Sequence, residues 1–282
     1  MPRIDTTARE KWPAPRPGPD VPTTVADVAA AEGETGADPR RAAARAVLAL
    51  LRWQYGEPEW PILNPLDALI EVLLSHRTAD PQTWAAFLRL RQRFPDWQAA
   101  VDAPVPEIEA AIAGTTWPEQ KAPRVQAVLR TILAERGSLD LDFLRTLPLG
   151  EASAWLQALP GVGPKSAACV LLFALHRPVL PVDTHVLRVS QRLGLIGPKT
   201  TADAAHTELL VLLHDPANAP DVLAFHRDML LHGQRICTWR DPRCPACVIR
   251  EWCAYFAAHP EQQAAAQAHG SQLPLSITDQ RT

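Results

Sequence analysis

The sequence lacks any apolar run long enough to cross a membrane. Hydrophobic residues make up 47% of its 282 positions, but no uninterrupted run approaches the roughly 20 residues that a membrane helix needs. The N-terminus also lacks the basic and then apolar pattern of a signal peptide. These absences predict a soluble, cytoplasmic protein without a membrane partner. Its apolar content suffices for one large domain or two modest ones.

The sequence also has no large excess of positive or negative charge. Lys and Arg total 28 against 31 for Asp and Glu, so the net charge is −3. A charge this small does not by itself indicate a nucleic-acid partner. Any such contact is therefore expected on one local face of the protein.

The pattern of a β-sheet is absent as well. No stretch alternates apolar and polar residues over a strand's length, and no internal repeat of fixed period is visible. Apolar residues instead recur at helical spacing, so we expect an all-α fold of ten or so short helices. The expected helices begin at Asp38, Asn64 and Asp80 and continue as 105–112, 119–136, 150–159, one from Pro164 or Lys165, 183–193, 200–213 and 220–232.

The two ends of the chain carry little apolar pattern. Residues 1–37 hold several prolines among small and charged residues, and residues 261–282 are rich in Gln, Ala and polar side chains. We expect a disordered Pro-rich tail at 1–37 and a second disordered tail at 261–282, which could hold a frayed helix.

One short stretch predicts a tight turn between two helices. It reads Leu159-Pro160-Gly161-Val162-Gly163-Pro164-Lys165. Glycine tolerates positive φ and proline interrupts helical hydrogen bonding, so a helical hairpin is expected here. We expect the backbone N–H groups around Gly161, Val162 and Gly163 to point outward and bind a phosphate without reading bases. Taken alone, the pattern also fits an ordinary helix connector.

The five cysteines are unevenly placed. Cys237, Cys244, Cys247 and Cys253 lie within seventeen residues, and such clustering in an intracellular chain indicates metal binding rather than disulfides. Structural zinc usually takes two close pairs, whereas one close pair with two longer arms can surround a cubane iron–sulfur cluster. A [4Fe-4S] cluster is therefore the prediction, zinc the alternative, and Cys169 is expected to be a small core residue.

These two motifs resemble those of the endonuclease III family of base-excision DNA glycosylases. The hairpin of that family typically reads Leu-Pro-Gly-Val-Gly followed by Arg-Lys-Thr-Ala, and the cysteine spacing matches its [4Fe-4S] loop cysteine for cysteine. The resemblance covers roughly residues 38–260. It implies two helical domains flanking a DNA-binding cleft. These are a six-helix barrel domain at 64–180, which holds the hairpin, and a discontinuous cluster domain at 38–63 and 181–260.

The resemblance also implies catalytic residues. Lys165 occupies the position of the family's nucleophile, and Asp183 that of its carboxylate, in Val-Asp-Thr-His. An amine that attacks C1′ can form a Schiff base and promote β-elimination, while a carboxylate stabilises an electron-poor sugar. We expect both groups to converge at one groove, with His185 and Arg188 contacting DNA. The implied function is a nucleoid-associated, monomeric, bifunctional glycosylase/AP lyase that removes oxidised pyrimidines from damaged double-stranded DNA and cleaves abasic sites.

Two expected DNA contacts depart from the family pattern. An extruded nucleotide leaves a gap that the enzyme must fill; the family usually does so with a glutamine where this chain has Arg77 and a leucine near Trp117. Arg77 is expected to stack or pair in the gap and Trp117 to wedge the stack. These departures leave open a weakly active damaged-DNA-binding paralogue. A monofunctional T/U:G mismatch glycosylase and a zinc-stabilised interaction module are further alternatives.

Overall fold

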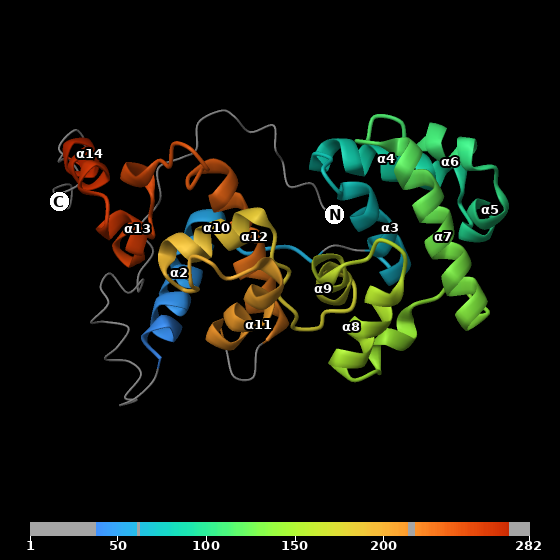
Figure 1. The fold of residues 1–282 in the computed structure, drawn as a ribbon, viewed down its shortest axis with the longest axis horizontal. Helices are drawn as coiled ribbons and strands as arrows, with labels where there is room; N and C mark the ends of the chain where they lie inside the picture. Colours follow the sequence, from blue (N-terminus) through green and yellow to red (C-terminus); the bar gives the residue numbers. More distant parts are fainter. Residues whose placement is uncertain (1–37, 61–62, 214–217, 271–282) are drawn as a thin grey trace, which may run out of the picture. The chain divides into compact units, whose positions relative to one another are not determined.

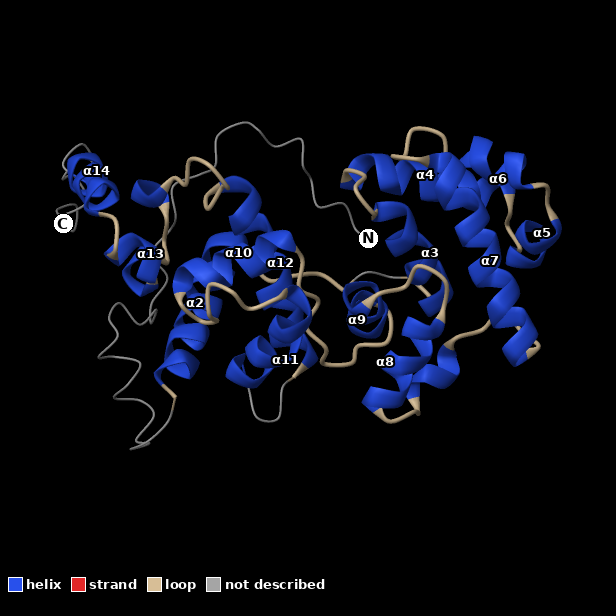
Figure 2. Ribbon diagram, in the orientation of Figure 1, coloured by secondary structure: helices blue, strands red, loops and turns tan. Residues whose placement is uncertain are grey.

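The computed structural model describes residues 38–60, 63–213 and 218–270, and they form helices and connecting loops (Figures 1 and 2). Within these ranges there is no strand, which confirms the all-α prediction. In the same described part, every helix is too short or too polar to cross a membrane. The tails predicted at 1–37 and beyond 270 lie outside the described residues.

The helices keep the order and spacing expected from the apolar pattern. In chain order they are α2 (Pro39–Tyr55), α3 (Pro65–Ser75), α4 (Asp80–Arg93), α5 (Trp97–Asp102), α6 (Val105–Ala111), α7 (Pro118–Arg136), η1 (Asp142–Arg145), α8 (Leu149–Ala158), α9 (Pro164–Phe173), α10 (Thr184–Leu193), α11 (Ala202–Leu213), α12 (Ala219–Arg235), η2 (Cys244–Ala246), η3 (Arg250–Trp252), α13 (Ala254–Ala257) and α14 (Pro260–Gly270).

Local capping chemistry explains where the N-terminal helices begin. The side chain of Asn64 accepts a hydrogen bond from the Asp67 N–H at 2.8 Å, and Pro65 takes the first helical position of α3. A proline fits there because its missing N–H would have no intrahelical partner. Helix α4 begins at Asp80, as the sequence predicts.

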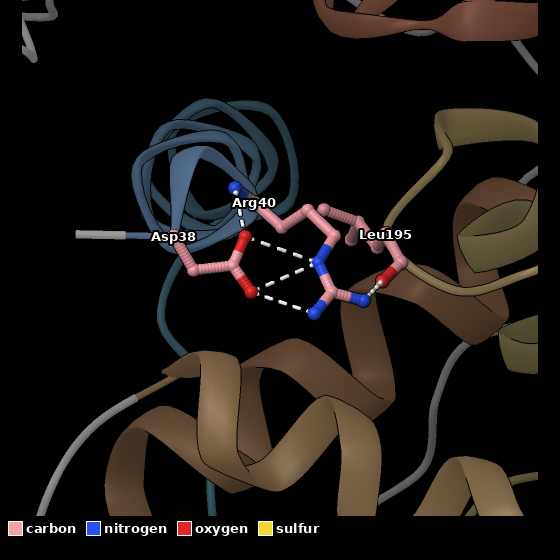
Figure 3. A network of polar contacts seen from close by, with 3 residues as sticks. All are labelled: Asp38, Arg40 and Leu195. Atoms are coloured by element: carbon pink, nitrogen blue, oxygen red, sulfur yellow. Dashed lines mark hydrogen bonds and ion pairs between the residues drawn. The ribbon is translucent and has the colours of Figure 1, made fainter. Parts of the chain in front are cut away.

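Helix α2 begins at a charged cap that also reaches another segment (Figure 3). Asp38 accepts from the Arg40 N–H at 3.0 Å, and the Arg40 guanidinium pairs with the same carboxylate at 2.6 Å. A further Arg40 nitrogen donates to the Leu195 carbonyl at 3.4 Å. One arginine thus links the start of α2 to the loop that follows α10.

Helices α5 and α14 fall outside the ranges that the apolar pattern predicted. Helix α5 has six residues, too few to display a helical period. Helix α14 (Pro260–Gly270) occupies the first part of the tail expected at 261–282, where the sequence allowed for a frayed helix. Pro260 begins this helix, its Ala and Gln residues favour helix, and it packs against η2 with Ala266 buried.

The described residues fall into two compact units. The first comprises Glu59–Pro181 together with the short segment 218–220, and the second comprises 38–58, 182–213 and 221–270. The expected domains had boundaries at 64 and 180. Helices α3 to α9, with the hairpin, belong to the first unit, whereas α2, α10 to α14 and the four clustered cysteines belong to the second.

The core of the first unit forms around α3 and α9, which pack against each other. The apolar stripe of α3, which includes Leu69 and Ile70, is buried against apolar residues of α9 such as Val170 and Leu171. Burying a side chain of this size contributes about 1.5–3 kcal/mol. This packing fixes the first turn of α9 near the loop that ends α3.

The second unit is joined by ion pairs as well as by apolar packing. Arg52 of α2 pairs with Asp221 of α12 at 2.7 Å. Arg227 of α12 pairs with its neighbour Asp228, which is fully buried, and also donates to the Gly56 carbonyl. The long helix α12 is thereby held against α2, and its C-terminal end leads into the cysteine loop.

Candidate functional site

The predicted hairpin is present between α8 and α9. Gly161 has φ +76°, and a Cβ at this position would collide with the Arg124 side chain. Val162 is buried, and its N–H donates to the Leu159 carbonyl at 3.1 Å. The expectation that the Val162 N–H faces a phosphate is therefore wrong, because the turn itself uses that donor.

The beginning of α9 is open where the hairpin ends. Gly163 is the N-cap and brings no side chain to the first turn, and Pro164 follows it. Helix N-termini of this kind favour an anion through their unpaired N–H groups and partial positive charge. The turn thus uses the Val162 N–H, while phosphate contacts at Gly161 and Gly163 stay predictions.

Lys165 lies half-buried in the first turn of α9 among other ionisable groups. Its neighbour Ser166 is buried, with Oγ 3.0 Å from His76 Nε2. Burial, together with the cations Lys165, Lys121 and Arg124, lowers the pKa of His76 to about 4. His76 is therefore neutral at pH 7 and forms an uncharged contact beside the candidate nucleophile.

Glu71 is a functional candidate that the sequence prediction missed. It lies on α3 and is only 8% exposed. Burial raises its pKa to about 7, while Lys165 acts in the opposite direction. The available signal was a single carboxylate inside the apolar run of α3. Perturbed carboxyl groups beside a candidate nucleophile are frequent in functional sites.

Asp183 has a definite structural role in the second unit. It is the N-cap of α10, and its Oδ1 accepts from the N–H groups of His185 at 2.8 Å and Val186 at 2.7 Å. Both bonds end on Oδ1, so neither uses Oδ2. Lys165 and Asp183 belong to different units. Their convergence at one groove stays a prediction.

The structure does not support Arg188 as a DNA contact. Its side chain is only 8% exposed. Its Nε donates to the Cys237 carbonyl at 3.1 Å, Nη2 donates to the Gly233 carbonyl at 2.7 Å, and Nη2 lies 3.1 Å from His185 Nδ1. We correct the prediction accordingly: the guanidinium donors hold α10 against the end of α12, and a phosphate would have to displace these partners.

Arg77 and Trp117, predicted from separate loops, lie together in the first unit. The Arg77 guanidinium carbon is 5.9 Å from the centroid of the Trp117 ring, within cation–π range. Both residues have positive φ, 54° and 55°, and both side chains are exposed, that of Trp117 by 47%. Non-glycine residues adopt this conformation at a cost of about 1–3 kcal/mol, a strain often found at functional sites.

The four clustered cysteines are free thiols at one end of the second unit. Cys237 follows α12, Cys244 begins η2, Cys247 follows it, and Cys253 caps α13. Burial raises the pKa of the Cys244, Cys247 and Cys253 thiols, and their neighbours in the set raise it further. Each of these three thiols therefore lies close enough to others of the set to be affected by their charge.

N–H groups surround these sulfurs. Arg192 Nη1 donates to Cys237 Sγ at 3.2 Å, His232 Nε2 lies 3.4 Å from Cys247 Sγ, and the Phe256 N–H donates to Cys253 Sγ at 3.5 Å. Such donors stabilise thiolates and tune a bound cluster.

The four cysteines could in principle hold a zinc ion or an iron–sulfur cluster. Within the described residues, no three of the His, Cys, Asp and Glu side chains come together as ligands of a single ion. Cys244 is buried and the other three cysteines are partly exposed, and their spacing of one close pair with two longer arms is of the kind that can surround a cubane cluster; the cluster stays a prediction.

Sequence comparisons identify relatives of this chain among DNA repair proteins. A putative DNA glycosylase of Arabidopsis thaliana is 38% identical over 175 residues, which cover 61% of this chain and 57% of the relative. Endonuclease III of Thermotoga maritima is 31% identical over 196 residues, or 68% of this chain and 84% of that protein. The DNA glycosylase/AP lyase ROS1 of Arabidopsis thaliana is 30% identical over 176 residues. The chain spans just over half the length of the first relative and 13% of ROS1.

Solved structures and a family model agree with these relatives. A trapped endonuclease III–DNA covalent intermediate superposes with a TM-score of 0.65 at 25% identity, covering 77% of this chain and 97% of that one. A thermostable thymine-DNA glycosylase has a TM-score of 0.66 at 18% identity, covering 79% and 100%, which supports the fold alone. The family model described as HhH-GPD superfamily base excision DNA repair protein matches residues 70–214. The chain belongs to this HhH-GPD superfamily and has the fold of an endonuclease III-like helix-hairpin-helix glycosylase.

Proposed function

We propose that this protein is a DNA glycosylase/AP lyase that acts on damaged double-stranded DNA as a monomer. The observation that carries the proposal is the position of Lys165, in the open first turn of α9 directly after the Gly161–Gly163 hairpin. Two similar proteins support it: ROS1, named a DNA glycosylase/AP lyase, and endonuclease III, solved as a covalent DNA intermediate. Oxidised pyrimidines and abasic sites are the proposed substrates.

In the proposed reaction the hairpin binds a backbone phosphate and positions the lesion nucleotide. The neutral amine of Lys165 attacks C1′, the N-glycosidic bond breaks, and its electron pair leaves with the base, which takes up a proton. The Asp183 carboxylate stabilises the positive charge that develops on the sugar. The sugar ring then opens to a Schiff base on Lys165. Loss of a proton from C2′ expels the 3′ phosphate, and hydrolysis returns the free amine.

The proposal includes a [4Fe-4S] cluster held by Cys237, Cys244, Cys247 and Cys253. When bound, the cluster would supply structural order to its loop, since metal binding and folding are coupled. Within the chain, the donors at Arg192 and Phe256 would orient two of these ligands. A broad visible absorbance of the purified protein supports the cluster. Colourless protein that contains zinc contradicts it.

Borohydride trapping on a panel of lesions tests the reaction. Wild-type protein should form a covalent product with duplex DNA that carries an oxidised pyrimidine or an abasic site. Lys165→Ala should abolish this product, whereas Lys199→Ala, at an exposed lysine, should leave it unchanged. Trapping that survives Lys165→Ala would overturn the assignment of the nucleophile.

Two alternatives have distinct outcomes in the same panel. Base release from T:G or U:G pairs without strand cleavage would indicate a monofunctional mismatch glycosylase. Tight lesion binding without product under single-turnover conditions would indicate a damaged-DNA-binding paralogue, which the exposed Arg77–Trp117 pair favours. Strand cleavage together with trapping supports the lyase over both.

A further inference from the structure

Two loops of the first unit are joined by hydrogen bonds at two threonines and a lysine. Thr78 follows α3 and is buried, 8% exposed. Its Oγ1 accepts from the Thr116 N–H at 3.0 Å and from Lys121 Nζ at 2.7 Å. Thr116 Oγ1 in turn donates to the Arg77 carbonyl at 2.9 Å. We refer to Thr78, Thr116 and Lys121 as the clamp, because they connect the loop after α3 to the loop before α7.

Lys121 is the least exposed member of the clamp. Its side chain is 4% exposed although it carries an ammonium group, and its Nζ also donates to the Leu74 carbonyl at 2.6 Å. Leu74 lies in the last turn of α3, where carbonyl groups and the helix dipole favour a cation. Lys121 is therefore committed to the protein interior and is not placed to bind a phosphate.

The clamp lies next to both strained residues in the sequence. Arg77 precedes Thr78 and Trp117 follows Thr116. Arg77 and Trp117 both have positive φ. Backbone conformations of this kind persist only where surrounding contacts determine them. The hydrogen bonds at Thr78 and Thr116 supply such contacts. They bond the backbone at Arg77 and Thr116, beside the cation–π pair already described.

The Arg77 and Trp117 side chains beside the clamp are exposed to solvent, without an apolar cover among the described residues of their unit. Trp117 is one of the few large hydrophobic residues exposed by about half, at 47%, and the Arg77 side chain is also exposed. An aromatic ring beside a cation suits a partner with both stacked π-faces and negative charge. Duplex DNA with a missing or extruded nucleotide offers both.

We propose that Thr78, Thr116 and Lys121 are positioning residues, which hold Arg77 and Trp117, already expected to fill the gap in duplex DNA, together as one preassembled wedge. This inference rests on the proposed function, in which an extruded nucleotide leaves a gap. Trp117 fills the gap by stacking, and the Arg77 guanidinium, held over the ring, meets the edge of the unpaired base. Because the clamp orders the two side chains before binding, less conformational entropy is lost in the complex.

The test compares the affinity of the protein for two duplexes, one intact and one with a central tetrahydrofuran site. This analogue resists cleavage, so the measurement is independent of trapping. Thr116→Val should reduce the preference for the gapped duplex about fivefold to tenfold, the loss expected for one hydrogen bond. Thr116→Ser, which keeps the hydroxyl, should retain the preference. Equal effects of the Val and Ser variants would overturn the role of Thr116.

A double-mutant cycle on the same duplexes tests whether Arg77 and Trp117 act as one unit. If Arg77 and Trp117 act as one unit, the double alanine variant loses little more preference than the more damaging single variant. Fully additive losses would mean that the two side chains act separately and would contradict a preassembled wedge.

Fluorine NMR of protein labelled with 5-fluorotryptophan separates positioning by Lys121 from a general role in folding. The Trp117 resonance is assigned by its absence in Trp117→Phe. Lys121→Met should shift this resonance and leave the other tryptophan resonances in place, while Lys199→Met shifts none of them. Movement of all resonances, or of none, in Lys121→Met would overturn the positioning role. If trapping fails but these shifts and the gap preference appear, the wedge stands and only the chemistry is wrong.

Discussion

Single side chains around the start of α9 combine deep burial with ionisable chemistry. Glu71 is almost inaccessible on α3, and burial raises its pKa to about 7. His76 shifts in the opposite sense, to about 4, because burial and nearby cations disfavour its charged form. At neutral pH this neighbourhood therefore carries less charge than its composition suggests.

The Glu71 carboxyl gives a pH-dependent prediction. Its folded pKa of about 7 lies above the unfolded value of 4.5, so the folded state loses stability as pH rises from 4.5 through 7. Glu71→Gln removes this cost and should raise the free energy of unfolding by about 1–3 kcal/mol at pH 8. Little difference should remain at pH 4.5. Urea unfolding at both pH values measures it, with exposed Glu135→Gln as the control. An identical gain at both pH values contradicts the prediction.

The two hairpin glycines should differ sharply in their tolerance of alanine. Gly161→Ala places a Cβ at φ +76° and against Arg124, and should lower the free energy of unfolding by about 1–2 kcal/mol. Gly163 has φ −95° and nothing within contact of a Cβ, so Gly163→Ala should change it by less than about 0.5 kcal/mol. Chemical denaturation of both variants provides the comparison. Equal costs would mean that the two glycines are not distinguished in this way.

At the scale of helices, Asp183 at the start of α10 has a capping role and a proposed catalytic role. The Asp183 side chain accepts hydrogen bonds from two backbone N–H groups there. The same carboxylate is proposed to act on the sugar. An isosteric substitution can separate the two roles, since asparagine caps a helix as well as aspartate does but carries no charge.

We predict that Asp183→Asn retains stability and loses base release. Its free energy of unfolding should stay within about 0.5 kcal/mol of the wild type, whereas Asp183→Ala should lose about 1 kcal/mol through the missing cap. Both variants should lose most of the base-release rate under single-turnover conditions. Full activity in Asp183→Asn would mean that Asp183 serves only as a helix cap.

At the scale of the whole molecule, two units of different construction share one chain. The first is continuous from Glu59 to Pro181 and has an extensive apolar core. The second is assembled from three described segments and ends in the cysteine loop. Loops that close around a metal depend on it for order, so the second unit is expected to depend on the proposed [4Fe-4S] cluster and the first is not.

Loss of the cluster should therefore loosen only one unit. In Cys247→Ser we expect the visible absorbance to disappear and amide hydrogen exchange to accelerate in η2, α13 and the end of α12. Exchange in α3, α7 and α9 should keep its wild-type rate. Hydrogen exchange with mass spectrometry resolves these peptides. Faster exchange throughout the chain, or nowhere, would contradict a cluster-dependent second unit.

Patterns local in the sequence predicted the helices well. Apolar stripes and caps such as Asn64 act over a few residues, so their geometry follows from local chemistry. Helix α5 was not predicted because its six residues are too few to show a helical period. The helix that the tail was expected to be able to hold is present as α14, where the burial of Ala266, a tertiary contact, stabilises the segment.

The sequence by itself determined the all-α fold, the hairpin with Lys165 in its second helix and the cysteine spacing, because each depends on residues near one another in the chain. Tertiary structure decided which side chains have partners. It buried Arg188 among carbonyl groups, used the Val162 N–H within the turn and placed Arg77 over Trp117. These outcomes depend on segments far apart in the sequence, whose contacts and burial no local pattern specifies.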